Sequence, residues 1–348
     1  MTAAMAKLRH RLFGSVGNTL LTVFMLYAFV SLLPPLVRWA AIDATWGAAT
    51  PEICRANGGA CWAFIHEKYR LILFGRYPYA EQWRPLLALA LAVLLVLATA
   101  SLRFGLRTVL AGWAVGVAAI IVLMRGGVPG LSFVPTDLWG GLPLTLMLAL
   151  GGMAGSFPIA IALALGRRSR LPIVKSISVA FIEMVRGVPL VSVLFMASFM
   201  IPLFLPGKVQ VDALVRALVA ITLFSSAYLA EAIRGGLQAV PAGQSEGAAA
   251  LGLTYWQPSL LIVVPQALRH AIPAMANLFI GLFKDTSLVG IVGLTDLLLA
   301  AKQALGDPQW RQFSLEGYAF VALIYVAFCF FISRYSRSLE HRLRREHH

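Results

Sequence analysis

The sequence predicts an all-α membrane protein that crosses the bilayer about eight times. Of its 348 residues, 59% are hydrophobic and only 13% are charged, and the mean hydropathy is +0.79. A soluble domain has roughly 45–50% apolar and about 25% charged residues. The apolar runs are continuous rather than alternating, which argues against a membrane β-barrel.

Eight segments are long enough to span a membrane as helices. A spanning helix needs about 20 apolar residues, because the hydrocarbon core is about 30 Å thick and each residue rises about 1.5 Å. Internal prolines are tolerated in such helices, because neighbouring helices satisfy the freed backbone groups. The predicted spans are 15–37, 85–101, 108–124, 141–165, 187–205, 213–232, 266–283 and 314–333.

The first span could instead be a signal peptide, since Lys7, Arg9 and Arg11 precede it. The apolar run is long, however, and contains Pro34 and Pro35, and no small-residue cleavage site follows it. We therefore expect a retained first helix.

The net charge of +14 reflects basic residues at helix ends rather than along one helix face. This distribution is typical of membrane orientation and does not favour nucleic-acid binding. The positive-inside rule places both termini in the cytoplasm. The basic C-terminal tail, 341–348, is expected to contact membrane lipid through anionic headgroups.

The chain divides near residue 135. Residues 1–135 contain three predicted helices and an outer, periplasmic loop over 38–84, whereas residues 136–340 contain five helices and most unusual polar residues. In the loop, Cys54 and Cys61 could form a disulfide if the compartment is oxidising, or could remain free thiols.

Motifs for catalysis and for nucleotide binding are missing from the sequence. Gly207-Lys208 lacks the other residues of a phosphate-binding loop, and no HExxH, GxSxG or metal-spaced Cys/His pattern occurs. The sequence therefore predicts no catalytic residue and no metal site, and it does not favour an enzyme.

A short helix over about 242–251 is expected in the loop between the sixth and seventh spans. Pro241 suits the first turn of a helix, Glu246 is favourable near its N-terminus, and Gly252 suits its C-terminal end. The helix consists largely of Gly and Ala, which would allow close approach to another protein. An ordinary alanine-rich surface helix is the alternative.

The stretch from Glu246 to Gly252, followed after nine residues by Ile262-Val-Val-Pro265, resembles the EAA loop of ABC-importer permeases. Gly247 replaces the first alanine of that pattern, and Val264 replaces a leucine. In this family the loop forms a coupling helix that inserts into a groove on an ATPase subunit. The resemblance implies that role for Glu246, Gly247, Ala248, Ala249, Gly252, Ile262 and Pro265.

The flanking segments are similar to the polar amino-acid permeases, which include histidine, glutamine and general L-amino-acid importers. The matching stretches are 181–190, 231–244, 265–269 and 283–288. The resemblance implies a MetI-like five-helix permease core over 136–340. The three additional N-terminal helices resemble the M-type subunit of general L-amino-acid importers.

This resemblance also implies an assembly in the bacterial inner membrane. The expected partners are two ABC ATPase subunits, a periplasmic amino-acid-binding protein and a second permease subunit, either a different chain or a second copy. ATP and Mg would bind the ATPase, and no cofactor would bind this chain.

Two polar segments are candidates for the translocation path or its gate. Glu183 and Arg186 are three residues apart in an apolar region and could offset each other's charge, or could be interfacial residues. Zwitterionic amino acids would meet complementary charges and hydroxyl groups at the second segment, although a helix-terminating Lys-Asp pair is the alternative. That segment consists of Lys284, Asp285, Thr286 and Ser287.

An ion-coupled secondary amino-acid transporter is the rival interpretation. It would favour acidic residues deep within the spans and inverted repeats. The predicted spans contain only Glu231 and Glu316, both near span ends, and Glu183 lies just before the span that begins at 187, so this alternative is weaker.

Overall fold

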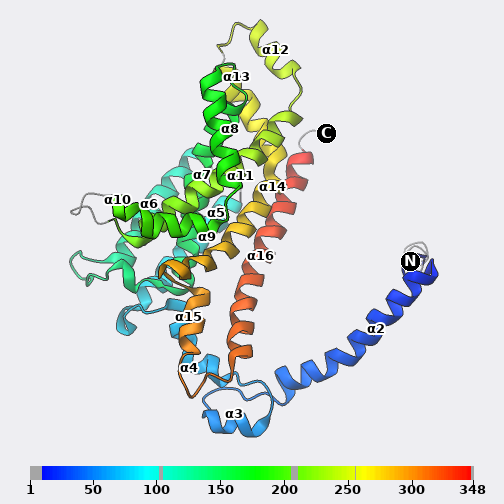
Figure 1. The fold of residues 1–348 in the computed structure, drawn as a ribbon, viewed down its shortest axis with the longest axis vertical. Helices are drawn as coiled ribbons and strands as arrows, with labels where there is room; N and C mark the ends of the chain where they lie inside the picture. The colour runs from blue at the N-terminus through cyan, green and yellow to red at the C-terminus, as the bar shows by residue number, and fades with distance from the viewer. Residues whose placement is uncertain (1–9, 102–104, 205–210, 255, 346–348) are drawn as a thin grey trace. The chain divides into compact units, whose positions relative to one another are not determined.

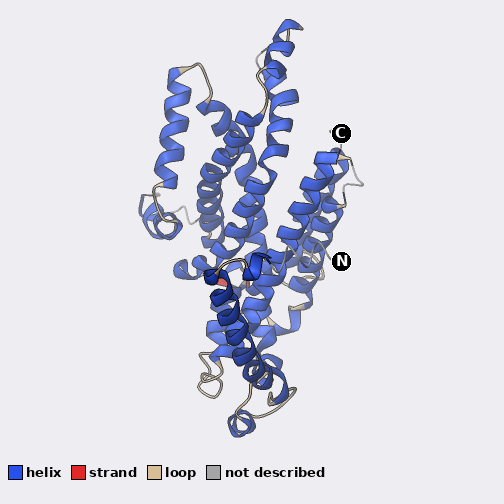
Figure 2. Cartoon of the chain, turned by 90° about the vertical axis from the view of Figure 1, so that its right-hand side faces the viewer, coloured by secondary structure: helices blue, strands red, loops and turns tan. Residues whose placement is uncertain are grey.

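The computed structural model describes residues 10–101, 105–204, 211–254 and 256–345, and these are almost entirely helical (Figure 2). Within these residues, seven helices are long and apolar enough to cross a membrane, or eight if one bent pair counts as a span. Lys7, Arg9, Gly207-Lys208 and the last three residues of the predicted basic tail lie outside the described residues.

The chain forms two compact units, the first comprising residues 1–69 and 305–317. Its long helix, α2 (Val16–Val37), begins at Ser15, whose hydroxyl accepts a hydrogen bond from the Asn18 amide, and continues into a π-helical turn, η1 (Arg38–Ile42). The apolar residues surround α2 on all sides, as in a helix that meets lipid.

The rest of the first unit is a small disulfide-bonded structure. Helix α3 (Pro51–Asn57) is joined to the start of α4 (Ala63–Phe74) by the Cys54–Cys61 disulfide. The Cys61 amide donates to the buried Glu316 carboxylate at 2.9 Å, and the Lys68 ammonium lies 2.9 Å from Asp307. These contacts hold 305–317 against the cysteine-containing segment.

The second unit, residues 70–304 and 318–348, begins with a helical pair. A 3-10 turn, η2 (Tyr79–Glu81), leads into α5 (Trp83–Ala100), which packs against α6 (Leu106–Arg125). The guanidinium of Arg84 is fully buried and donates to the carbonyls of Leu123 and Ser132. A buried cation needs such acceptors, so this contact fixes the α5–α6 pair.

The central helices of this unit are α7 (Gly141–Arg167), α11 (Ala213–Ala239) and α14 (Val264–Asp285), joined by α16 (Ser314–Arg345). A short turn, η3 (Thr136–Leu138), precedes α7. Small residues let the helices approach closely. A Cβ on Gly236 of α11 would lie 2.1 Å from the Ala267 carbonyl oxygen of α14, so only glycine fits there.

The predicted span 187–205 is observed as a helical segment over 190–204, which a sharp bend separates from a helix before it. Helix α8 (Pro172–Arg186) was not expected, and it is followed by α9 (Leu190–Phe195), the π turn η4 (Met196–Met200) and α10 (Ile201–Phe204). The two parts meet at 102° (Figure 1). Pro189 lacks an amide hydrogen and disfavours helical geometry at the preceding residue, which explains the break.

The remaining elements occupy opposite ends of the second unit. Helix α12 (Gly243–Ala250), α13 (Trp256–Pro258) and the π turn η5 (Ser259–Val263) precede α14 at one end. At the other end lie η6 (Thr286–Val292), the two-residue strand β1 (Thr295–Asp296) and α15 (Leu297–Ala304) (Figure 1). Strand β1 pairs with Gly140 and Gly141 at the start of α7.

Candidate coupling segment and translocation path

Helix α12 lies where the sequence predicts a short helix, and it presents almost no bulk. Glu246 and Gly247 are exposed, whereas Ala248 is 4% exposed. A Cβ on Gly247 would meet no atom within 4 Å, so nothing in this chain requires a glycine there. The side of α12 that contains Gly247 is therefore free to approach another molecule.

A glycine-dependent cap ends α12. Gly252 has a φ of +73°, and the Leu253 amide donates to the Ala248 carbonyl at 3.3 Å. This six-residue closure is the Schellman arrangement, in which the left-handed residue is usually glycine. The predicted stop at Gly252 thus has a definite physical cause.

Side-chain hydrogen bonds join α12 to the helix that follows. The Gln266 amide nitrogen of α14 donates to the Gln244 side-chain oxygen at 3.2 Å and to the Ile262 carbonyl at 3.0 Å. Ile262 lies in η5, and Pro265 is in the first turn of α14. One hydrogen bond thus links α12 to α14, and η5 connects the two along the chain.

A group of five charged residues joins α7, α8 and α11. The Arg167 guanidinium lies 2.9 Å from Glu183 and 2.8 Å from Glu231. Glu231 also accepts from Arg234 at 2.9 Å and lies 4.0 Å from Arg186. Glu183 and Arg186 thus have different partners, and Glu231, whose side chain is 16% exposed, is the centre of the group.

A cavity of about 230 Å³ lies between α7, α11 and α14. Its polar lining consists of Ser225 and Tyr228 from α11 and Asn277 and Asp285 from α14. An apolar cavity of roughly 150 Å³ holds benzene, so this one is large enough for a small amino acid. Its carboxylate could accept from an ammonium group, and its hydroxyl and amide groups could donate to a carboxylate.

The four residues from Lys284 to Ser287 lie in different surroundings. Asp285 lines the cavity, whereas Lys284 is exposed. Thr286 is fully buried, and its hydroxyl donates to the Phe283 carbonyl at 2.7 Å. Ser287 is half-buried in η6. Of the predicted segment, only Asp285 is brought to the cavity.

Sequence reasoning missed Asn277, Tyr228 and Arg167. Asn277 is an amide inside an apolar span, which is itself a signal of a polar path because buried amides need partners. Arg167 lies just beyond the predicted span 141–165, and its contacts with Glu183 and Glu231 arise only when α8 and α11 are placed beside it. Within the described ranges, no group of three His, Cys, Asp or Glu residues could hold a metal ion.

These features together define a polytopic membrane protein with a small helix available for docking and a polar cavity between its spans. A family model described as "Binding-protein-dependent transport system inner membrane component" matches residues 156–345. The chain belongs to this family of inner-membrane permease components. The ion-coupled alternative is not supported by this match.

Known relatives agree with this assignment. The chain is similar to the inner membrane amino-acid ABC transporter permease protein YhdY of Escherichia coli (strain K12), with 48% identity over 97% of this chain and 93% of YhdY. It is 38% identical to the glutamate/glutamine/aspartate/asparagine transport system permease protein BztC of Rhodobacter capsulatus, over 98% of this chain and 94% of BztC.

A solved structure extends the similarity to three dimensions. It is described as an amino acid ABC transporter with histidines and matches with a TM-score of 0.51 and 30% sequence identity. The match covers 58% of this chain and 92% of the other.

Proposed function

We propose that this chain is a permease subunit of an ATP-driven importer and moves L-amino acids across the inner membrane. Helix α12 is the observation that supports this most directly. It is exposed, small in side-chain volume and hydrogen-bonded to α14, which also lines the polar cavity. The names of the full-length relatives support amino acids as the cargo.

In this mechanism α12 sits in a groove on an ATPase subunit. Nucleotide binding to that subunit stabilises one position of α12, and a loaded periplasmic binding protein stabilises the same state from outside. Two ligands then bias one conformational equilibrium, which alternates access to the cavity. This chain makes and breaks no covalent bond, and ATP and Mg bind the ATPase.

The cavity offers partners for both ends of a zwitterion. Asp285 would meet the ammonium group, while Ser225 and Asn277 would donate to the carboxylate. The five-charge group at Glu231 would hold α7, α8 and α11 together in the state described here. Glu183 and Arg186 thus act through neighbouring helices rather than on the amino acid.

The assembly we propose contains two ATPase subunits, a second and different permease chain and the binding protein. Both termini of this chain are cytoplasmic, which places α12 on the ATPase side. A homodimer of this chain is the alternative stoichiometry.

Copurification and transport test this proposal together. The tagged chain, extracted from native membranes, should bring an ATPase and a second permease with it. Vesicles that contain the complex should accumulate amino acids only with ATP on the α12 side and binding protein on the other. Uptake that persists without ATP but needs an ion gradient would contradict the proposal.

A further inference from the structure

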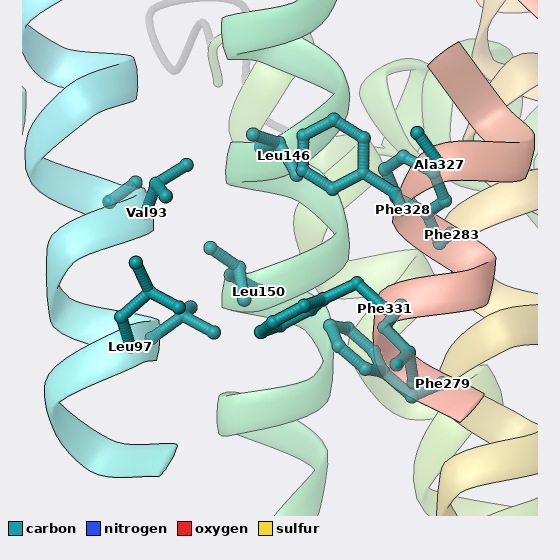
Figure 3. Close-up of a pocket in the computed structure, with 12 residues that line it drawn as sticks. Val93, Leu97, Leu146, Leu150, Phe279, Phe283, Ala327, Phe328 and Phe331 are labelled. Carbon is teal, nitrogen blue, oxygen red and sulfur yellow. The ribbon is translucent and has the colours of Figure 1, made fainter. Parts of the chain in front are cut away.

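A second cavity, of about 300 Å³, lies between α5, α7, α14 and α16. Twelve residues line it, four each from α5 and α16 and two each from α7 and α14, and all are Ala, Val, Leu, Ile or Phe. Figure 3 shows Phe331 of α16 and Leu150 of α7 between α5 and α14. The cavity therefore lies at the interface between α5 and the central helices.

Neither water nor an amino acid suits this cavity. A trapped water needs two to four polar partners, and an apolar cavity of roughly 150 Å³ stays dry and binds benzene. The twelve lining side chains offer no hydrogen bond. An empty cavity would leave the rings of Phe279, Phe283 and Phe331 without contacts on one side. A hydrocarbon occupant restores those contacts.

All four helices belong to membrane spans. The hydrocarbon that surrounds them, and that could fill the cavity, is therefore lipid acyl chains. An acyl chain gains no hydrophobic transfer energy when it moves from the bilayer into a protein cavity. Preference for one lipid over another must therefore come from its headgroup.

Exposed arginines follow the part of α16 that lines the cavity. Leu97, three residues before the end of α5, and Ile332, in the second half of α16, are the lining residues nearest the C-terminal ends of these helices. Beyond Ile332, Arg334 and Arg337 are exposed. From 334 to 345 the sequence contains five arginines and one glutamate. Such clusters beside a span attract anionic lipid headgroups.

We propose that this cavity binds an acyl chain of an anionic phospholipid from the surrounding bilayer, with its headgroup held by Arg334 and Arg337. The lipid fills the interface between α5 and the central helices and packs against Phe279 and Phe283 of α14. The site is distinct from the polar cavity, which lies across α14 and is lined by Asp285.

Photolabelling tests the site in the unmodified protein. The full chain, in its complex, is placed in nanodiscs of phosphatidylethanolamine with phosphatidylglycerol that bears a photoreactive group in its acyl chain. Mass spectrometry should find labels concentrated on 92–97 and 327–332. Excess unlabelled phosphatidylglycerol should remove these labels, while excess phosphatidylethanolamine should not.

Two variants separate the acyl chain from the headgroup. Ala327→Phe fills the cavity and should abolish its labelling, whereas Val115→Phe on the exposed face of α6 should leave it unchanged. Arg334→Gln with Arg337→Gln should reduce labelling several-fold, whereas Lys175→Gln on α8, which does not line the cavity, should have no effect.

Two results would overturn the proposal. The first is labelling spread evenly over the lipid-facing helices of the wild-type chain, and the second is equal competition by the two lipids. Because both are measured on the wild type, the test does not depend on whether Ala327→Phe folds.

Discussion

The two faces of α14 line two different cavities, one polar and one apolar. Asn277, Gly281 and Asp285 follow one another at intervals of four and line the polar cavity. Phe279 and Phe283, also four apart, line the apolar cavity. Residues four apart lie on the same side of a helix, whereas residues two apart lie on nearly opposite sides. The period of the helix therefore separates the proposed amino-acid path from the proposed lipid site.

The two ends of α14 differ in a similar way. Its beginning is hydrogen-bonded to α12 through Gln266, and its end leads to the buried strand β1. The helix thus connects an exposed element to an enclosed one.

Two carboxylates near the end of α14 have different surroundings, and this difference can be measured. Asp285 lines a cavity, whereas Asp296 is fully buried, and burial raises the pKa of Asp296 from 3.8 to about 6 despite hydrogen bonds from the Leu298 and Leu299 amides. The folded state then binds the proton more tightly than the unfolded state. Stability is therefore lost as the pH rises from about 4 through 6.

The Asp296→Asn variant should remove this dependence, because asparagine keeps the helix cap but carries no charge. A shift of about two pKa units corresponds to about 3 kcal/mol, so the variant should be more stable than wild type by up to that amount at pH 7 and equal to it near pH 4. Thermal unfolding in detergent from pH 4 to 8 measures the difference. Parallel curves for the two proteins would contradict this prediction.

Asp285→Asn tests the polar face of α14. A hydrogen bond to a charged group is worth about 1.5–3 kcal/mol, so we expect the substrate concentration for half-maximal uptake to rise by about 10–100-fold. Phe279→Leu, on the opposite face, should leave this concentration unchanged. The measurement is amino-acid uptake into vesicles, and equal effects of the two substitutions would remove the distinction between the faces.

Phe283→Ala tests the apolar face. Phe283 is 1% exposed and packs against Tyr325 and Phe328. In a soluble core the change costs about 3–5 kcal/mol. Within a membrane the transfer component is largely absent, because lipid is also apolar. We therefore expect a loss of about 1–2 kcal/mol, measured by denaturation in mixed micelles, and a loss as large as in a soluble core would show that this reasoning fails.

Alanine substitutions at two glycines, Gly247 in α12 and Gly252 just after it, should change the stability of this helix in opposite directions. Gly252→Ala places a Cβ at a φ of +73° and should weaken the helix cap by about 1 kcal/mol. Gly247→Ala lies inside the helix with open space around it and should strengthen the helix by a similar amount. Hydrogen exchange of the 243–250 amides distinguishes the two, and equal protection in both variants would contradict the assigned cap.

Sequence reasoning predicts the spans well because hydrophobic length is a local property. Seven predicted segments correspond to apolar helices, and the expected helix over 242–251 is observed as Gly243–Ala250. The exception is the region around Gly187 and Pro189, where the proline was visible but the 102° change of direction was not. Proline indicates a break, whereas the angle depends on packing against α7 and α11.

The candidate site was less predictable because it depends on contacts between distant segments. Arg167 and Glu231 are 64 residues apart, and their contact requires α7 and α11 to be placed first. Asp285 lines the cavity whereas Thr286 is buried away from it. This difference depends on which side of the chain faces α11, and the positions of two adjacent residues in the sequence do not reveal it. The domain boundary near residue 135 stays a prediction.

Helix α12 is the part of this chain that we propose docks with the ATPase. Gly247→Trp adds a large side chain where this chain leaves open space, so the fold should be unaffected. Gly105→Trp, before α6, is a matched control, because a side chain there also meets no atom within 4 Å. We expect ATP-driven uptake by the reconstituted complex to fall at least about tenfold with Gly247→Trp and to be unchanged with Gly105→Trp. Normal uptake by a folded Gly247→Trp variant would contradict the account.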